Sequence, residues 1–208
     1  MACIICEESR KDEDDEAPAP DQDEADFWLR LGRRGGGYDP RSGSRHSKYE
    51  CYEKACEAGP NRTDTWYALG RSGGGVVSGR NFNEKACFQQ VLALDPQHAS
   101  AWTWLGDEDG GIVGGQRYSE KECYAKAITM DPNQAEAWGL LGIGGGGVVN
   151  GINYNERECY EQALAANPTH ARAWNWLGKM GGGTVAGKWY SREECEERWQ
   201  PTRRSNFS

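Results

Sequence analysis

The sequence predicts an α-rich repeat solenoid in which each unit holds two helices with a short β-hairpin between them. Tryptophan and cysteine recur at a constant step of 36 residues, and such self-similarity is the signature of a repeat architecture. The recurring positions are Trp66, Trp102, Trp138 and Trp174, and Cys87, Cys123, Cys159 and Cys195. Each unit also contains a helix-start signal, a hairpin-turn signal and a second helix-start signal. Because repeats contact mainly their neighbours, we expect a linear core.

The chain is expected to divide into an N-terminal tail, one solenoid of five units and a C-terminal tail. The approximate boundaries are 1–26 for the first tail, 27–61, 62–97, 98–133, 134–169 and 170–200 for the units, and 201–208 for the last tail. The first unit has a longer hairpin region, and the last departs from the pattern at Trp199 and Pro201. Terminal repeats often depart in this way, so the array ends there as a cap, or the chain is truncated.

The first 26 residues are expected to be an acidic, disordered tail. They hold eleven acidic and two basic side chains, so this segment has a formal charge of −9. The whole chain has a formal net charge of −8, so the repeats are close to neutral. With so few apolar side chains, this segment cannot fold alone. We expect a solvated arm, with a docking tail for a basic partner as the alternative. Cys3 and Cys6 lack a second pair or histidines at zinc spacing, so mobile thiols are expected rather than a metal or redox site.

The chain shows no targeting or membrane-spanning signal. Its start lacks the basic residues and long apolar run of a secretory signal. No stretch approaches the roughly 20 apolar residues of a membrane helix. An intracellular protein, cytoplasmic by default and without membrane insertion, is therefore expected.

The first helix of the fourth unit is expected to start at the pair Asp131-Pro132. Asp131, just before this unit, is a candidate N-cap, and Pro132 fits the first helical position. Trp138 and Leu141 then share one face. Gly142 stands where a left-handed C-cap residue would end the helix.

A β-hairpin is expected after the glycine run that follows this helix. Asn150-Gly151 between β-forming residues is a strong signal for a two-residue type I′ turn. Pairing around this turn places on one face Gly147, Val149, Ile152 and Tyr154. Three of these four residue classes recur in the other units, so this face is expected to be buried.

The second helix is expected to start directly after the hairpin, at a Ser or Asn cap. Ser119 with Glu122 three residues later fits a capping box. An aromatic residue or histidine precedes each cap. A cysteine lies five positions after that residue, which is the spacing of a hydrophobic staple. The repeated cysteines are therefore expected to be small packing groups. Cysteines one repeat apart should exceed the roughly 7 Å Cα limit of a disulfide.

Two glycine patterns imitate nucleotide-binding motifs but fail on context. Residues 142–147 satisfy G-x-G-x-x-G, yet a helix precedes them and a hairpin follows, unlike the βαβ unit that the motif requires. Near Gly182, a P-loop-like pattern has Trp189 where Ser or Thr must hold magnesium. The three histidines converge on no catalytic triad. We expect no enzyme, no cofactor, no metal site and no small-molecule substrate.

Several motifs resemble the tetratricopeptide repeat, a helix-turn-helix unit of about 34 residues. They are Trp138-x-x-Leu141-Gly142, Tyr160-x-x-Ala163-Leu164 and Asn167-Pro168. The likeness extends from residue 28 to about 200, although glycines and a hairpin replace the tight turn. The resemblance implies a right-handed superhelix of helix pairs that binds protein segments without catalysis. A known lysine/asparagine clamp for C-terminal carboxylates is not matched, since Leu29 and Arg33 stand where its first pair would be.

The resemblance also implies a protein-binding groove along the first helices. The expected lining residues are Asp64, Tyr67, Arg71, Ser100, Thr103, Asp107, Glu136, Gly139, Ile143, Arg172, Asn175 and Lys179. This strip is mixed in charge with more basic ends, so it suits an extended peptide with separated acidic groups better than nucleic acid, which needs a continuous basic track.

The expected function is therefore a non-catalytic protein–protein interaction scaffold. One alternative is a structural or accessory subunit of a large assembly, and a weaker one is a cysteine-based redox or metal-binding protein. Trp104 and Trp176 occur only in alternate units. They either fill gaps between layers or form an apolar surface for a partner.

Overall fold

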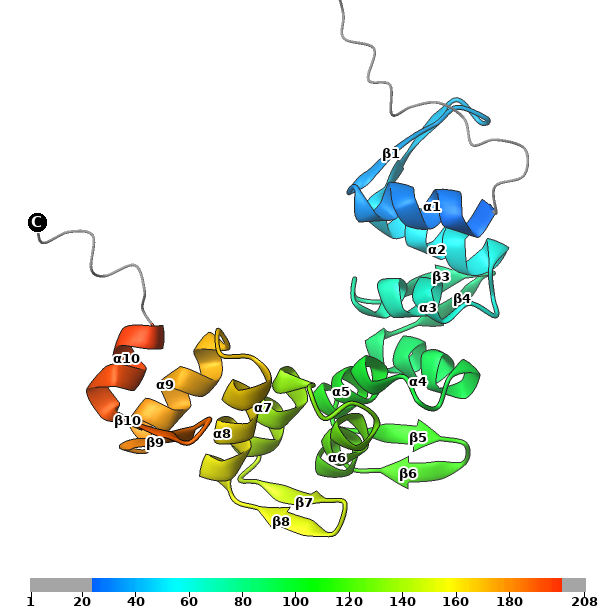
Figure 1. Ribbon diagram of the computed structural model, residues 1–208. Coiled ribbons are helices and arrows are strands. Elements are labelled where there is room, and N and C mark those ends of the chain that lie inside the picture. Colours follow the sequence, from blue (N-terminus) through cyan, green and yellow to red (C-terminus); the bar gives the residue numbers. More distant parts are fainter. Residues whose placement is uncertain (1–23, 200–208) are drawn as a thin grey trace, which may run out of the picture.

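The protein is described by a computed structural model over residues 24–199, where helix pairs alternate with two-stranded antiparallel hairpins (Figure 1). The first, or A, helices are α1 (Glu24–Arg33), α3 (Thr63–Gly70), α5 (Ala99–Asp107), α7 (Ala135–Ile143) and α9 (Ala171–Lys179). The second, or B, helices are α2 (Lys48–Ala58), α4 (Glu84–Leu94), α6 (Glu120–Met130), α8 (Glu156–Ala166) and α10 (Arg192–Trp199). The predicted fold class is confirmed.

One hairpin joins the A helix to the B helix in each pair. The hairpins are β1 (Gly36–Asp39) with β2 (Ser44–Ser47), β3 (Gly75–Val77) with β4 (Arg80–Phe82), β5 (Gly111–Val113) with β6 (Gln116–Tyr118), β7 (Gly147–Val149) with β8 (Ile152–Tyr154), and β9 (Gly182–Val185) with β10 (Lys188–Ser191). The helix pairs follow one another along an open arc, and β5–β6 and β7–β8 project from its outer side (Figure 1).

The expectations for the two ends of the chain concern residues mostly outside the described range. Residues 1–23, with Cys3 and Cys6, and residues 200–208 belong to this group. The expected tail boundary at residue 26 falls inside α1, which begins at Glu24. Acidic side chains in a first helical turn favour the helix, because they face its positive N-terminal end.

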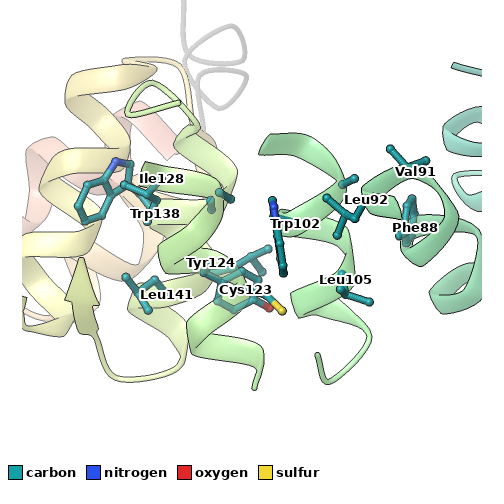
Figure 2. Close-up of a cluster of buried hydrophobic side chains, with 14 of the residues drawn as sticks. Phe88, Val91, Leu92, Trp102, Leu105, Cys123, Tyr124, Ile128, Trp138 and Leu141 are labelled. Atoms are coloured by element: carbon teal, nitrogen blue, oxygen red, sulfur yellow. The ribbon is translucent and has the colours of Figure 1, made fainter. Parts of the chain in front are cut away.

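The core is one continuous row of buried side chains from Trp28 to Cys195. Figure 2 shows the part of this row that runs from Phe88 to Leu141. The helices α2, α4, α6 and α8 each pack against the A helix of their own pair and the A helix of the next, and α10 packs against α9. The expectation of a linear core built by neighbouring units is confirmed.

The A helices begin later than the sequence suggested. Asp131 is the C-cap of α6, and its carbonyl accepts a hydrogen bond from the Gln134 N–H (3.1 Å) in a turn that precedes α7. The predicted N-cap role of Asp131 is therefore wrong. Pro132 lies in this turn, and its carbonyl accepts from Trp138 Nε1 (3.0 Å). The same bond links Trp66 to Pro60, Trp102 to Pro96 and Trp174 to Pro168.

Gly142 is not the left-handed cap that was expected. It lies inside α7, and a Cβ atom added there would be 2.6 Å from Cε1 of Tyr160 in α8. Glycine at this position therefore allows the two helices of the unit to approach closely. The left-handed residues come later, at Gly145 (φ +86°) and Gly146 (φ +83°).

The hairpin turn follows the prediction, but its buried face is smaller. Asn150 and Gly151 have φ of +50° and +80°, and Val149 pairs with Ile152 across the turn, as a type I′ hairpin requires. Val149 is buried, whereas Ile152 is 57% exposed, so its predicted burial is wrong. The reason is that α6 lies against the first strand, β7, and leaves the tip of the second strand open.

The predicted starts of the B helices are confirmed. Ser47, Ser119 and Asn155 form complete capping boxes with the glutamate three residues later. The residue before each cap lies against the core tryptophan of its own unit, as Tyr154 does against Trp138 at 4.8 Å between ring centroids. The described cysteines, all free and buried, are Cys51, Cys56, Cys87, Cys123, Cys159 and Cys195. Their predicted packing role is confirmed.

We expect Cys123 and Cys159 to resist alkylation in the folded protein. Burial raises the pKa of both thiols to about 12, so neither supplies the reactive thiolate at about pH 8, near the usual thiol pKa. Iodoacetamide labelling followed by peptide mass spectrometry, with and without denaturant, would measure this. Rapid labelling of either cysteine without denaturant would contradict the buried packing role.

Candidate protein-binding surface

The expected groove residues form three columns along the A helices, defined by their distance from the core tryptophan. The first column, two positions before it, contains Asp64, Ser100, Glu136 and Arg172. The second column, one position after it, contains Tyr67, Thr103, Gly139 and Asn175. The third column, five positions after it, contains Arg71, Asp107, Ile143 and Lys179. The columns differ in how much of each side chain is available to a partner.

The first column is occupied by contacts between neighbouring units. Glu136 of α7 contacts Nε2 of His170, the N-cap of α9, and Nη1 of Arg172 in α9, each at 2.9 Å. Ser100 Oγ accepts a hydrogen bond from Gln134 Nε2 (3.2 Å). We call this row of polar contacts between units the polar seam. A partner that bound these atoms would have to break contacts that join the units.

The seam begins at the N-terminal end with a shared arginine. Arg62 Nη2 binds Asp64 at 2.8 Å and Asp26 of α1 at 2.5 Å. The hydrogen bond from Arg62 holds the pKa of Asp64 below its usual value. Asp64 is thus an ionised member of a contact between units at neutral pH.

Histidines supply part of the seam and also cap two A helices. His170 Nδ1 accepts from the Ala173 N–H (3.2 Å), so its proton is assigned to Nε2, which donates to Glu136. This bond, followed by the charge of Arg172, lowers the pKa of Glu136. Because this folded pKa lies below the unfolded value, the contact stabilises the fold at neutral pH and is lost as pH falls through the lowered pKa.

The sequence interpretation missed these histidine caps. His98 accepts from the Ala101 N–H (3.2 Å) in the same way. Each histidine lies three residues before an alanine of its A helix, and the two histidines are two repeats apart. This recurring position is the sequence signal that could have indicated the caps.

The second column is largely covered. Thr103 is 2% exposed, and its hydroxyl donates to the Ala99 carbonyl oxygen (3.2 Å). Gly139 is buried, and a Cβ atom there would be 3.2 Å from the His170 ring. The expectation that these two residues line an accessible surface is therefore wrong. Tyr67 and Asn175 are half-buried.

The third column is exposed in all four units that carry it. Ile143 is 46% exposed, and Arg71, Asp107 and Lys179 are also exposed. Within residues 24–199, no side-chain hydrogen bond or ion pair occupies Arg71, Asp107 or Lys179. Each unit therefore presents one exposed side chain in this column, and these side chains are basic, acidic, apolar and basic in turn.

The two alternate tryptophans fill space beside the third column. Trp104 donates from Nε1 to the Tyr67 hydroxyl of the preceding unit (3.0 Å), and Arg71 lies 3.5 Å above its ring. Trp176 stacks on Tyr160 of the preceding unit, with 6.4 Å between centroids and 9° between planes. These contacts support the gap-filling interpretation, while both rings remain half-buried.

The glycine turns are closed to phosphate by their own hydrogen bonds. The Gly145 N–H donates to Gly142 O (2.8 Å), and the Gly146 N–H donates to Leu141 O (2.9 Å). A phosphate-binding loop would need such amides to be free. The P-loop-like stretch near Gly182 lies in the β9–β10 hairpin.

Among residues 24–199, no three His, Cys, Asp or Glu side chains are grouped to hold a metal ion. None of the helices in this range is long and apolar enough to cross a membrane.

One family model supports the resemblance drawn from the sequence. Residues 157–181, which run from the first turn of α8 through α9, match a family model described as the tetratricopeptide repeat. No curated protein matches the chain. A solved structure described as the crystal structure of MamA protein is 16% identical, covers 86% of both chains and gives a TM-score of 0.47.

Proposed function

We propose that this chain is a non-catalytic scaffold that binds a segment of another protein across its A helices. Tetratricopeptide repeats generally serve as protein–protein interaction scaffolds, and residues 157–181 match that family. The observation that carries the proposal is the third column, which is exposed at every step while the first column joins units and the second is largely covered. Protein partners are therefore proposed to lie along Arg71, Asp107, Ile143 and Lys179.

The chemistry of this column suits an extended peptide. Packed helices lie about 8–10 Å apart, so one unit corresponds to about three residues of extended chain at roughly 3.3 Å each. The column has cations at its ends, a carboxylate at Asp107 and an apolar side chain at Ile143. A nucleic acid would need a continuous basic track, which this alternation does not provide.

Charge reversal in the third column is expected to weaken partner capture strongly. We suggest Arg71→Glu with Lys179→Glu, because both cations are exposed and neither joins neighbouring units through an ion pair. Affinity capture from the native source with quantitative mass spectrometry should show at least a tenfold loss of the specific partner. Circular dichroism should show unchanged thermal unfolding.

The matched control reverses two exposed cations on the hairpins, Arg117→Glu with Lys188→Glu. This control changes the net charge equally and should retain the partner. Equal loss in both variants would show a general charge effect and contradict the proposed surface. Arg172 is less suitable for the test, because its reversal would repel Glu136 and weaken the polar seam.

One observation favours a second function, that of an accessory subunit in a larger assembly. Val76, Ile112 and Val148 recur at the same hairpin position and are all exposed. Exposed apolar side chains in a regular row are typical of surfaces that contact other chains. If the hairpin control loses the partner and the third-column variant retains it, this second function is the better account.

A further inference from the structure

The geometry points to Arg71 and Lys179 as two carboxylate-binding positions, held by tryptophan rings, that select a partner segment with two acidic groups a fixed distance apart. This inference rests on the proposed function and names the chemistry of the partner. The occupant is an extended acidic segment of another protein. The charge complementarity comes from two exposed cations that no carboxylate in residues 24–199 neutralises.

Arg71 is arranged as a receptor for a carboxylate. Its guanidinium lies 3.5 Å above the centre of the Trp104 ring, so one flat face is covered by the indole. The N–H donors of a guanidinium point outward in its plane, and stacking leaves that edge free. A carboxylate can accept two parallel hydrogen bonds from such an edge.

Trp104 is fixed by contacts that do not involve Arg71. Its Nε1 donates to the Tyr67 hydroxyl (3.0 Å), and the Tyr67 ring lies 5.1 Å from the His98 ring and 6.0 Å from the Phe88 ring. The guanidinium therefore rests on a rigid surface made by two units. A side chain that is already ordered loses less conformational entropy when it binds.

Lys179 has a related arrangement at the other end of the third column. Its ammonium nitrogen lies 4.2 Å from the centre of the Trp176 ring, and Trp176 is stacked on Tyr160. Both cations thus lie on a tryptophan that is held by an aromatic residue of the preceding unit. The ammonium is a compact charge, so this position accepts an anion with less directional demand than Arg71.

The separation of the two positions sets the spacing of the ligand. Arg71 follows α3 and Lys179 ends α9, so three unit steps lie between them. At about 8–10 Å per packed helix, this distance is about 25–30 Å. An extended peptide covers it with about eight or nine residues. Between the two acidic groups, the segment passes Asp107 and Ile143, which disfavour a further acidic residue and favour an apolar one.

The test uses the full chain and synthetic peptides of defined charge. The main probe is a fluorescein-labelled peptide with two Glu pairs separated by about seven neutral residues, to match the spacing above. One comparison peptide places the Glu pairs about two residues apart, and another replaces Glu by Gln at the wide spacing. Fluorescence anisotropy at low salt should show saturable binding of the wide peptide. The comparison peptides should bind at least tenfold more weakly.

The Arg71→Gln variant should bind the wide Glu peptide about tenfold more weakly than the unmodified chain. Arg117→Gln is the matched control, since it removes one exposed hairpin cation, and it should leave binding unchanged. Equal effects of the two substitutions, or no saturable binding of the wide peptide, would overturn the inference. A peptide that copies residues 7–16 of this chain is also tested. If it binds through Arg71 more tightly than the wide peptide, the occupant is the chain's own acidic segment and the inference is overturned.

Trp104 is a positioning residue, and a double-mutant cycle separates this role from general stability. Trp104→Leu should weaken binding in the unmodified chain but add no further loss to Arg71→Gln, because it acts through the guanidinium. Thermal unfolding of each variant would check that the compared proteins are folded. Additive losses would contradict the positioning role.

These outcomes are distinct from failure of the scaffold proposal. If the peptides do not bind but native partner capture still depends on the third column, the carboxylate inference fails and the scaffold stands. If capture is independent of that column, the scaffold surface itself is wrong.

Discussion

Replacing Gly146 by alanine is expected to destabilise the fourth unit by about 3 kcal/mol or more, whereas replacing Gly145 should cost only about 1 kcal/mol. Both glycines have nearly the same left-handed conformation, with φ of +83° and +86°. A Cβ atom at Gly146 would collide with the carbonyl oxygen of Tyr154, while at Gly145 nothing lies within 4 Å. Because the collision involves backbone, the strands β7 and β8 would have to separate.

Denaturant unfolding of the two alanine variants would measure this difference directly. Gly145→Ala serves as the matched control, because it carries the conformational strain without the collision. The same collision recurs at Gly74, Gly110 and Gly182. Equal destabilisation by the two substitutions would show that backbone conformation alone explains the need for glycine.

The second large effect is expected for Trp138→Ala, at about 3–5 kcal/mol. Trp138 is 5% exposed, contacts the Tyr154 ring and donates to the Pro132 carbonyl oxygen. Trp189→Ala is the control, because Trp189 is 55% exposed on its hairpin. Surface substitutions of this kind usually change stability by less than about 0.5 kcal/mol.

The loss of Trp138 should also change how the chain unfolds. Repeats are stabilised by their own packing and by the interfaces with their neighbours. A weakened fourth unit therefore separates α9 and α10 from the first three units, and the transition should broaden or divide in two. Denaturant unfolding followed by circular dichroism and by tryptophan fluorescence would report this. Coincident single transitions at the original midpoint would contradict the central packing role of Trp138.

The elements with strong local signals were predictable from the sequence. The tryptophan step located the A helices, the Ser and Asn caps located the B helices, and Asn150-Gly151 located a hairpin turn. These signals act over a few residues, so they do not depend on the rest of the fold. The Asp131-Pro132 pair misled because proline fits both the first turn of a helix and the residues just after one.

The features that depend on contacts between units were not predictable from the sequence. Gly142 resembled a C-cap, but the reason for glycine is the approach of Tyr160 from the next helix. Thr103 was polar and at a regular position, yet the neighbouring packing buries it. The pairing of Arg71 with Trp104 joins two units and leaves no signature within either one.

The constant step of the repeat fixes the distances between equivalent positions along the array. Each unit contacts mainly its neighbours, so the distance between Arg71 and Lys179 is a whole number of steps. Removing residues 134–169 would take away one step, about 8–10 Å, and bring Tyr124 to the position that Tyr160 holds beneath Trp176. In the proposed binding mode, the chemistry at both ends would stay the same, and the expected peptide would be shorter by about three residues. In the proposed complex, the number of units would set the length of the bound segment, and Arg71 and Lys179 would set its charge.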